Sequence, residues 1–250
     1  MMSIIISVTG KGGTGKTTIS GLLIDAIARR KPGPVLAVDA DPNSTLPDML
    51  GVKEFGTVVD IVDNISSHLD TIPPGMTKDR FIDLKVQEAV MEKDSFDLLV
   101  MGRPEGPGCY CYVNNLLRDL IRKLTESYQF VVVDNEAGME HISRRTTRVA
   151  DRLLVVSDCS LIGVRSAKRI FELAKDIGIK IGKAYLAVNK KAGEVGPLTR
   201  EIEKLPISFA GFIPQDEEIV DLALSGGSIL GLKSQEVRRS IEKIVDTILA

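Results

Sequence analysis

The segment that most constrains this chain is GKGGTGKT, at residues 10–17. It matches the pattern G-x-x-x-x-G-K-[ST], and it stands between a short apolar run, Ile4–Val8, and a segment with helical periodicity, Thr17–Arg30. In that context glycines let backbone N–H groups approach phosphate oxygens, and the start of the helix adds a favourable partial charge. A chance glycine-rich turn would need neither neighbour, so the segment predicts a nucleoside-phosphate site.

The pattern also predicts roles for individual side chains. Lys16 is expected on the β- and γ-phosphates, and the Thr17 hydroxyl is expected on Mg²⁺. Lys11 is an extra lysine directly after the first glycine, and from the loop alone it is equally well a solvated surface residue. The residues predicted to bind the nucleotide here are Gly10, Lys11, Gly12, Gly13, Thr14, Gly15, Lys16, Thr17 and Thr18.

Short apolar, β-branched runs alternate with helical patterns along the rest of the chain. Because the runs are continuous, they predict strands covered on both faces, and their alternation with helices predicts a parallel sheet. Further strands are expected at Val35–Val38, Leu98–Met101, Phe130–Val133, Leu153–Val156, Tyr185–Val188 and Phe209–Ile213, and further helices from about Asn114, at Val164–Ile177 and at Glu236–Leu249. We expect one α/β P-loop domain over residues 1–250, a mostly parallel twisted sheet flanked by helices. The weakly patterned region Leu46–Asp97 is expected to hold helices or an insertion.

Composition disfavours several classes of function. The net charge is −2, and no run of Lys and Arg interleaves with aromatic residues, so no nucleic-acid partner is expected. Three cysteines cannot make a paired disulfide framework, which favours a reducing, cytoplasmic compartment. The first ten residues lack a basic region and a cleavage site, and no apolar stretch reaches the roughly 18 residues of a spanning helix. We therefore expect a cytoplasmic protein without membrane contact.

With its extra lysine, GKGGTGKT resembles the deviant Walker A loop of the MinD/ParA/nitrogenase-iron-protein class of P-loop ATPases. In that class the first lysine crosses a dimer interface to the partner's nucleotide, so the resemblance implies a homodimer and a catalytic role for Lys11. The segment VDADPNS resembles the switch I of the class, in which Asp41 would orient the attacking water. The terminal helix differs from the basic membrane helix of MinD, because its charges are mixed, and it is expected to pack in the core.

Carboxylates stand at the ends of two predicted strands. Asp39 and Asp41 follow the second strand, where ligands of open α/β sheets bind, although a D-x-D-P sequence taken alone is well explained as a turn. Asp134 follows the buried run FVVV and suits a Mg²⁺ site reached through water, with Gly138 free to move after it. Catalysis is expected from Lys11, Lys16 and Asp41, and nucleotide or Mg²⁺ binding from Asp39, Asp134 and Gly138.

The segment VNKKAG favours adenine over guanine. GTPases read guanine with an N-K-x-D loop, and here Asn189-Lys190 is present but the fourth position is Ala192. Asn189 matches the adenine-contacting asparagine of the class, and IPQD resembles the P-x-D segment that flanks the base, which adds Pro214 and Asp216 to the predicted site. An ordinary strand-end turn is the alternative for Asn189. The expected cofactors are therefore ATP or ADP with Mg²⁺.

Two cysteines one residue apart, Cys109 and Cys111 in GPGCYC, offer two sulfur ligands. Zn²⁺ and Ni²⁺ thiolate sites usually take four ligands, so a twofold dimer could complete a Cys₄ site with two cysteines from each chain. Inert packing and a redox pair stay open as alternatives, although residues i and i+2 are poorly placed for an unstrained disulfide. Cys159 stands alone and is expected to be structural, and His141 is expected to pack or hydrogen-bond.

Taken with VVVDNEAGMEHISRRTTRVAD, the sequence GCYCYVNNLLRDL resembles the CooC-type ATPases. These are MinD-class proteins that insert nickel into carbon monoxide dehydrogenase, with a close branch that serves acetyl-CoA synthase. The resemblance covers nearly the whole chain. It implies an ATP-hydrolysing metallochaperone, a homodimer dependent on nucleotide and metal that binds nickel, or zinc, at Cys109 and Cys111. It also implies a nickel-enzyme client, with the acetyl-CoA synthase branch slightly favoured.

Other functions of the class stay open. A partitioning or positioning switch like MinD or ParA would bind membrane or DNA, and its cysteines would be incidental. A cobalamin-type amidating synthetase would use a carboxylate substrate with ammonia or glutamine, and a soft-metalloid ATPase would use the thiols as an effector site. A nitrogenase-type iron–sulfur cluster is disfavoured because NEAGMEHIS lacks the cluster cysteine.

Overall fold

The structure, a computed structural model, describes residues 3–30, 33–103, 122–124, 126–137 and 149–250. Its strands form one sheet in the order β3-β4-β2-β5-β1-β6-β7-β8, parallel throughout except where β3 meets β4. The strands are β1 (Ile4–Gly10), β2 (Val35–Ala40), β3 (Met91–Glu92), β4 (Asp97–Val100), β5 (Phe130–Asn135), β6 (Val149–Asp158), β7 (Lys180–Lys191) and β8 (Ser208–Pro214). The helices are α1 (Lys16–Arg29), α2 (Leu46–Met49), α3 (Val58–Ser67), α4 (Lys78–Glu88), α7 (Leu161–Asp176), α8 (Gly196–Ile202), α9 (Glu217–Ser225) and α10 (Gln235–Leu249).

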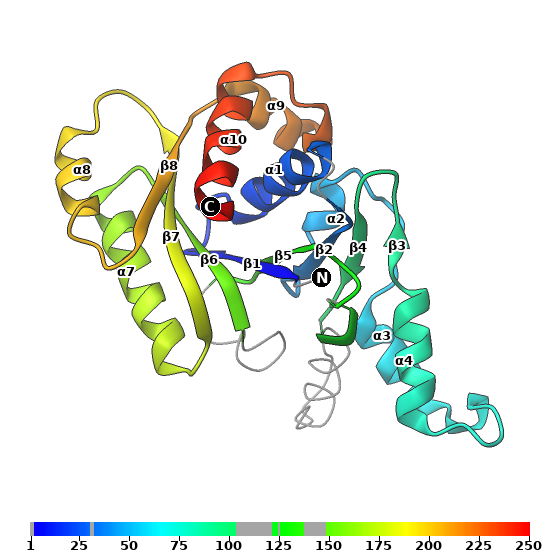
Figure 1. The fold of residues 1–250 in the computed structure, drawn as a ribbon. Helices are drawn as coiled ribbons and strands as arrows, with labels where there is room; N and C mark the ends of the chain where they lie inside the picture. The colour runs from blue at the N-terminus through cyan, green and yellow to red at the C-terminus, as the bar shows by residue number, and fades with distance from the viewer. Residues whose placement is uncertain (1–2, 31–32, 104–121, 125, 138–148) are drawn as a thin grey trace.

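Helices cover both faces of this sheet (Figure 1). On one face α1 and α10 lie side by side, and alternate residues of the central strands, among them Ile6 and Val8, join them in one apolar core. On the other face α3 and α4 pack over β2 and β4, and α7 packs over β6 and β7, in two further apolar clusters. Coverage on both faces explains why the strands carry continuous apolar runs. The predicted α/β class, with a mostly parallel sheet flanked by helices, is confirmed.

Every strand predicted from the sequence is present, and nearly all extend beyond their apolar runs. The short antiparallel strand β3 is not among the predicted ones, because two residues give no periodic signal. The weakly patterned region Leu46–Asp97 holds α2, α3 and α4, which confirms the expectation of helices there. The helix expected from about Asn114 lies outside the described residues.

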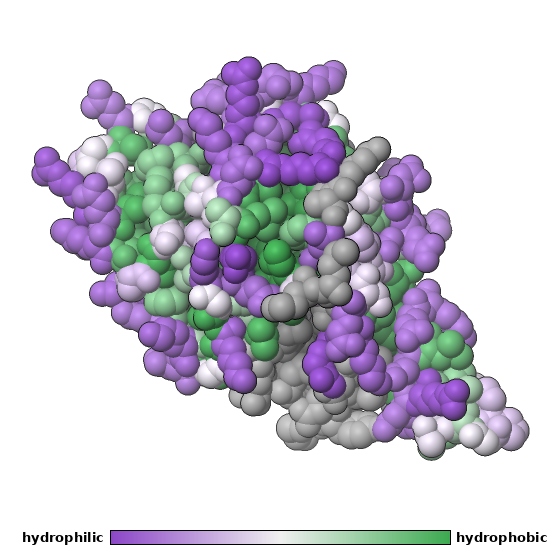
Figure 2. All heavy atoms as spheres, in the orientation of Figure 1, coloured by the Kyte–Doolittle hydropathy of each residue, from purple (hydrophilic) through white to green (hydrophobic). Residues whose placement is uncertain are grey.

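The last helix, α10, turns its apolar stripe toward the sheet. Val237, Ile241, Ile244, Val245 and Ile248 are all buried. Figure 2 shows hydrophilic side chains over the outer surface of this helix, at the top of the view. The expectation of a core-packed terminal helix is confirmed. In the described part of the chain, no helix is both long enough and apolar enough to cross a membrane.

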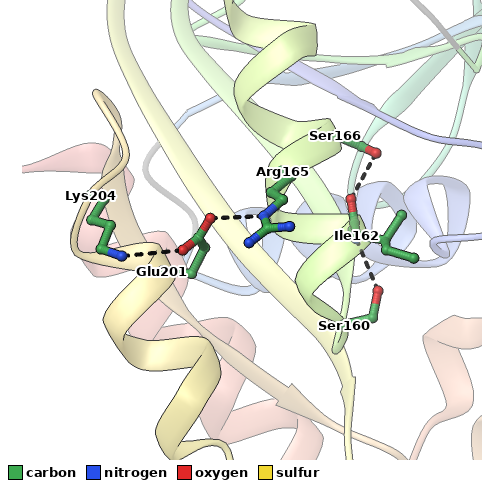
Figure 3. A network of polar contacts seen from close by, with 7 residues as sticks. Ser160, Ile162, Arg165, Ser166, Glu201 and Lys204 are labelled. Carbon is green, nitrogen blue, oxygen red and sulfur yellow. Dashed lines mark hydrogen bonds and ion pairs between the residues drawn. The ribbon is translucent and has the colours of Figure 1, made fainter.

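Polar contacts set the position of α7 and α8 at the other end of the sheet (Figure 3). The Ser160 hydroxyl accepts the Gly163 N–H at 2.9 Å and so caps the start of α7. Arg165 of α7 donates to Glu201 of α8 at 3.0 Å, and Lys204 approaches the second oxygen of the same carboxylate at 3.5 Å. Of these two ion pairs only Arg165–Glu201 joins α7 to α8, since Lys204 follows α8 directly. Both cations are exposed, so the pairs contribute little to stability.

Candidate nucleotide-binding site

The glycine-rich loop leaves β1 at the carboxyl edge of the sheet and enters α1. Gly13 and Gly15 have φ angles of +78° and +87°, a region that residues with a Cβ rarely adopt. Gly10 lies against β6, and a Cβ there would come within 2.3 Å of the Val156 carbonyl oxygen. The backbone therefore requires glycine at these three positions. Gly12 is different, since the nearest atom to a Cβ at that position would be Ala137 Cβ, 3.9 Å away.

Lys16 is the first residue of α1 and is buried. Its Nζ lies 3.4 Å from the Lys11 carbonyl oxygen, so the ammonium is folded back over the loop. The hydroxyls of Thr17 and Thr45 lie 3.5 Å apart at the same edge of the sheet. The side chain of Lys11 is exposed, and no described side chain pairs with its ammonium. That ammonium is therefore accessible to a second molecule.

Asp39, near the end of β2, is fully buried and uses both carboxylate oxygens on the loop that follows. One oxygen accepts the N–H of Asp41 at 3.0 Å, and the other accepts the N–H of Leu46 at 2.9 Å. Burial raises the pKa of Asp39 to about 7, and the nearby Asp134 adds to the rise, while the two backbone N–H groups oppose it. In the structure Asp39 shapes the loop, and its predicted contribution to nucleotide binding stays a prediction.

Asp134, at the end of β5, is a second fully buried carboxylate. Its Oδ1 accepts the Ser20 hydroxyl at 2.8 Å, whereas its Oδ2 has no partner within the described residues. Burial raises the pKa of Asp134 to about 6, although the hydroxyls of Thr17 and Ser20 and the charge of Lys16 oppose the rise.

An unpaired carboxylate oxygen beside a threonine hydroxyl fits a hydrated Mg²⁺ ion. Mg²⁺ binds through one or two protein oxygens and keeps several waters, so it does not need a closed cage of side chains. Among the described residues, no three His, Cys, Asp or Glu side chains come together as such a cage. Thr17 and Asp134 are thus the groups that could hold the cation, one directly and one through water.

Asp41 lies half-buried in a tight turn. Its Oδ1 accepts both the backbone N–H and the side-chain N–H of Asn43, at 2.9 and 2.8 Å. This is the local side-chain-to-backbone turn that the D-x-D-P sequence favours. The turn interpretation is confirmed, and the water-orienting role of Asp41 stays a prediction.

A cavity of about 400 Å³ opens beside the loop. It brings together the predicted residues Thr18, Asn189, Pro214 and Asp216. Apolar side chains from α1 and α9 supply the walls, and a few polar groups stand at one end, which is the usual make-up of a site for a flat organic ligand. The apolar lining residues are Ile19, Leu22, Ile213, Ile219, Val220, Ala223 and Leu224.

Asn189 is buried between this cavity and the loop. Its Nδ2 donates to the Thr14 carbonyl oxygen at 2.9 Å, and a Cβ on Gly15 would come within 2.4 Å of that nitrogen. The amide therefore packs directly on the glycine-rich loop. An asparagine amide carries a second N–H and a carbonyl oxygen, so further hydrogen-bonding capacity remains for a bound base.

Asp216 supports the wall of the cavity. Its Oδ1 accepts the N–H of Glu218 at 3.0 Å and caps α9, and its Oδ2 accepts the Ser234 hydroxyl at 2.6 Å. Glu218 accepts the N–H groups of Lys233 and Ser234, both at 2.8 Å. None of the residues of α9 is fully buried, so these polar contacts and the partly buried Ile219 and Leu222 together hold the helix beside the cavity.

Lys190 is a site residue that the sequence patterns do not single out. Its Nζ donates to the Gly13 carbonyl oxygen at 3.0 Å, next to the bond between Asn189 and Thr14. An Asn-Lys pair at a strand end is the available signal, but the guanine-reading pattern directs attention to the fourth position. The apolar residues of the cavity carry no signal at all, since apolar positions on a helix equally predict core packing.

Several predicted residues fall outside the described part of the chain. These are Gly138, His141 and the pair Cys109 and Cys111, so the C-x-C metal site stays a prediction. Cys159 is half-buried after β6 and packs against the apolar core under α7, as a structural cysteine should.

The chain is similar to a family of nucleotide-binding domains and to several known proteins. The model of the CobQ/CobB/MinD/ParA nucleotide binding domain matches residues 5–229. An uncharacterized ATP-binding protein of Methanocaldococcus jannaschii is 43% identical, with 98% of each chain aligned. The carbon monoxide dehydrogenase accessory protein CooC of Rhodospirillum rubrum is 32% identical over 70% of each chain. The solved structure of the septum site-determining protein MinD of Pyrococcus horikoshii, in complex with Mg-ADP, shares the fold with a TM-score of 0.71 at 20% identity, over 99% of this chain and 96% of that one.

Proposed function

The chain belongs to the family of CobQ/CobB/MinD/ParA nucleotide-binding domains, and on that premise we propose that it is a Mg²⁺-dependent ATPase that delivers nickel to an enzyme. The observation that carries the nucleotide part is the continuity of the site. The glycine-rich loop, the buried Lys16, the two buried carboxylates and the cavity all adjoin at one edge of the sheet. The Mg-ADP complex of the Pyrococcus relative and the ATP-binding description of the Methanocaldococcus relative support ATP as the ligand.

Each group at the phosphate end has a task. The loop N–H groups and Lys16 would bind the phosphates, with the ammonium exchanging its long contact to the Lys11 carbonyl for phosphate oxygens. Thr17 and Asp134 would hold Mg²⁺, which when bound neutralises charge on the phosphates. Asp41 would orient the attacking water.

At the other end the cavity would hold adenine. Asn189 would use its free carbonyl oxygen to accept from the amino group of the base, since its Nδ2 already donates to Thr14. Ala192 stands where a guanine-reading loop has its carboxylate, which supports ATP over GTP.

The exposed Lys11 supports a homodimer. A lysine that sits on the phosphate loop and pairs with no described side chain could reach the nucleotide of a second protomer. There it would supply positive charge to the transferred phosphoryl group, as arginine fingers do in other ATPases and GTPases.

The nickel part of the proposal rests on sequence. The CooC relative, at 32% identity over 70% of each chain, is named as an accessory protein of carbon monoxide dehydrogenase. Cys109 and Cys111 supply two thiolates per chain, and a dimer would supply the four that Ni²⁺ or Zn²⁺ commonly takes. Nickel is then the cargo, and carbon monoxide dehydrogenase or acetyl-CoA synthase is the client.

A switch ATPase of the MinD or ParA kind is the second candidate, because the matching family includes both. Such a protein would bind membrane or DNA when loaded with ATP. Co-sedimentation with anionic vesicles or with nonspecific DNA in the presence of a non-hydrolysable ATP analogue would favour this candidate over metal delivery.

Phosphate release and oligomer mass, measured on the same samples, test the ATPase. We expect the wild-type protein to hydrolyse ATP and to dimerise with ATP. Lys16→Gln should lose nucleotide binding, and Lys11→Gln should keep ADP binding but lose hydrolysis and the dimer. Lys53→Gln, which removes an exposed lysine far along the chain, is the control for the change in charge. Hydrolysis by Lys11→Gln at the wild-type rate would contradict the dimer mechanism.

A further inference from the structure

Lys190 stands in a backbone conformation that is unfavourable for a lysine. Its φ is +57°, and in the described part of the chain only Ser44 shares a positive φ without being glycine. The left-handed region brings Cβ close to the backbone, and among residues with a side chain mainly Asn and Asp tolerate it. It occurs at the end of β7, where the register with β8 shifts between Val188 and Lys191. Residues held in such conformations cluster at functional sites.

The contacts of the side chain show what this conformation achieves. Lys190 Nζ donates to the Gly13 carbonyl oxygen at 3.0 Å, and Asn189 Nδ2 donates to the next carbonyl oxygen, that of Thr14, at 2.9 Å. Two consecutive carbonyl groups of the phosphate loop are therefore held by two consecutive side chains of one strand end. No other described side chain donates to these two carbonyls.

These two contacts also fix the directions of the next two backbone N–H groups, those of Thr14 and Gly15. In a trans peptide the C=O and N–H point in opposite directions, and no cis peptide occurs among the described residues. Because the Gly13 carbonyl points toward Lys190, the N–H of Thr14 points away from Lys190. In the same way, because the Thr14 carbonyl points toward Asn189, the N–H of Gly15 points away from Asn189. The Thr14 N–H has only a long contact of 3.5 Å, to the Lys11 carbonyl. These are the groups a phosphate would need.

We propose that Lys190 is a positioning residue that orients the phosphate-binding loop and links it to the base cavity; this rests on the ATP site proposed above. Lys190 and Asn189 line the cavity and also bind the loop, and the N–H of Gln215, another lining residue at the end of the neighbouring strand β8, donates to the Lys191 carbonyl at 3.0 Å. One strand end thus contacts both halves of the site. A nucleotide should therefore be bound far better than either of its halves.

Replacement by asparagine separates this role from a structural one. Asn accepts the left-handed backbone, so Lys190→Asn removes the ammonium without adding strain. Its side chain is too short to reach the Gly13 carbonyl. Lys190→Arg keeps a long cationic donor. Lys191→Asn makes the same chemical change at the next residue, whose Nζ lies 5.7 Å from the centre of the Phe212 ring and lines no part of the cavity.

We expect Lys190→Asn to weaken ADP binding, measured calorimetrically with Mg²⁺, by about tenfold or more, as for loss of a charged hydrogen bond. Adenosine, which has no phosphates, should bind within about twofold of wild type by NMR titration, since its contacts do not involve the loop N–H groups. The midpoint of thermal unfolding without ligand should not fall. Lys190→Arg should recover most of the ADP affinity, and Lys191→Asn should match wild type.

Three results would overturn the proposal. They are unchanged ADP affinity in Lys190→Asn, an equal loss of ADP and adenosine binding, and a lowered unfolding midpoint without ligand. The wild-type titration separates this failure from failure of the proposed function. If the wild-type protein binds no ADP, the ATP site and the role of Lys190 fall together. If wild type binds ADP and the variant binds it equally well, only the role of Lys190 falls.

Discussion

The buried carboxylate of Asp39 accepts the backbone N–H of Asp41 at 3.0 Å. Its second oxygen accepts the N–H of Leu46 at 2.9 Å, so one side chain holds both ends of the loop that carries Asp41. The loop is thereby fixed at the carboxyl edge of the sheet, beside Asp134 and the start of α1. A carboxylate that can change its charge is thus the support for the residue proposed to orient water.

This arrangement predicts a pH dependence of stability. Burial raises the pKa of Asp39 from 3.8 to about 7, and that of Asp134 to about 6. Between the ordinary aspartate pKa and these raised values, the folded state holds protons that the unfolded chain has released. The free energy of unfolding should therefore fall as pH rises from about 4 to 7. Each group contributes at most about 1.4 kcal/mol per pH unit. Urea unfolding of the nucleotide-free protein across this range measures the slope.

Asp39→Asn isolates the contribution of one group, because the amide does not titrate. Its slope should be smaller than that of wild type, whereas Asp48→Asn, which removes an exposed carboxylate from the following helix, should leave the slope unchanged. Mg²⁺ with ADP should also flatten the slope, since a bound cation favours the ionised carboxylates. A stability that rises between pH 4 and 7 would contradict the assignment.

Two glycines of the loop, Gly10 and Gly12, are predicted to differ in how much an alanine at each position destabilises the protein. Gly10→Ala would place a Cβ 2.3 Å from the Val156 carbonyl oxygen, and both groups lie in the backbone of paired strands. We expect a loss of at least about 2 kcal/mol in urea unfolding, because neither strand can move away cheaply. Gly12→Ala, two residues along, meets nothing closer than 3.9 Å and should change stability by no more than about 0.5 kcal/mol. Equal effects at the two positions would refute the close approach of β1 to β6.

Much of the fold could be predicted from the sequence because its signals are local. Continuous apolar runs mark β1, β2, β4 and β5 as strands covered on both faces, and the stripe from Val237 to Ile248 marks the buried face of α10. The strand β3 has two residues and no period, so its pairing with β4 across a turn closed by the Lys93 N–H and the Phe96 carbonyl leaves no pattern to read. Sequence patterns also do not give the strand order, in which β5 lies between β1 and β2.

The residues of the candidate site could be predicted where they belong to a motif with fixed spacing or stand at the end of an apolar run. Lys16, Thr17 and the strand-end carboxylates stand where the pattern places them. Patterns did not reveal that Asp39 and Asp216 are engaged in holding a loop and a helix end, because a carboxylate on a backbone N–H has the same sequence signature as one on a ligand. The role of Lys190 depends on a φ angle and on a contact 177 residues away in the chain.

Metal stoichiometry tests the nickel-delivery proposal most directly. Equilibrium dialysis with Ni²⁺ would be carried out on the nucleotide-free, ADP and non-hydrolysable-ATP forms, with oligomer mass recorded on the same samples. We predict one nickel per dimer, an affinity that depends on the nucleotide, and loss of the metal in Cys109→Ala/Cys111→Ala with ADP binding retained. Cys159→Ala, which removes the third cysteine, should bind nickel as wild type does. Full nickel affinity in the double variant, or no nickel bound by a dimer that still forms with ATP, would contradict metal delivery.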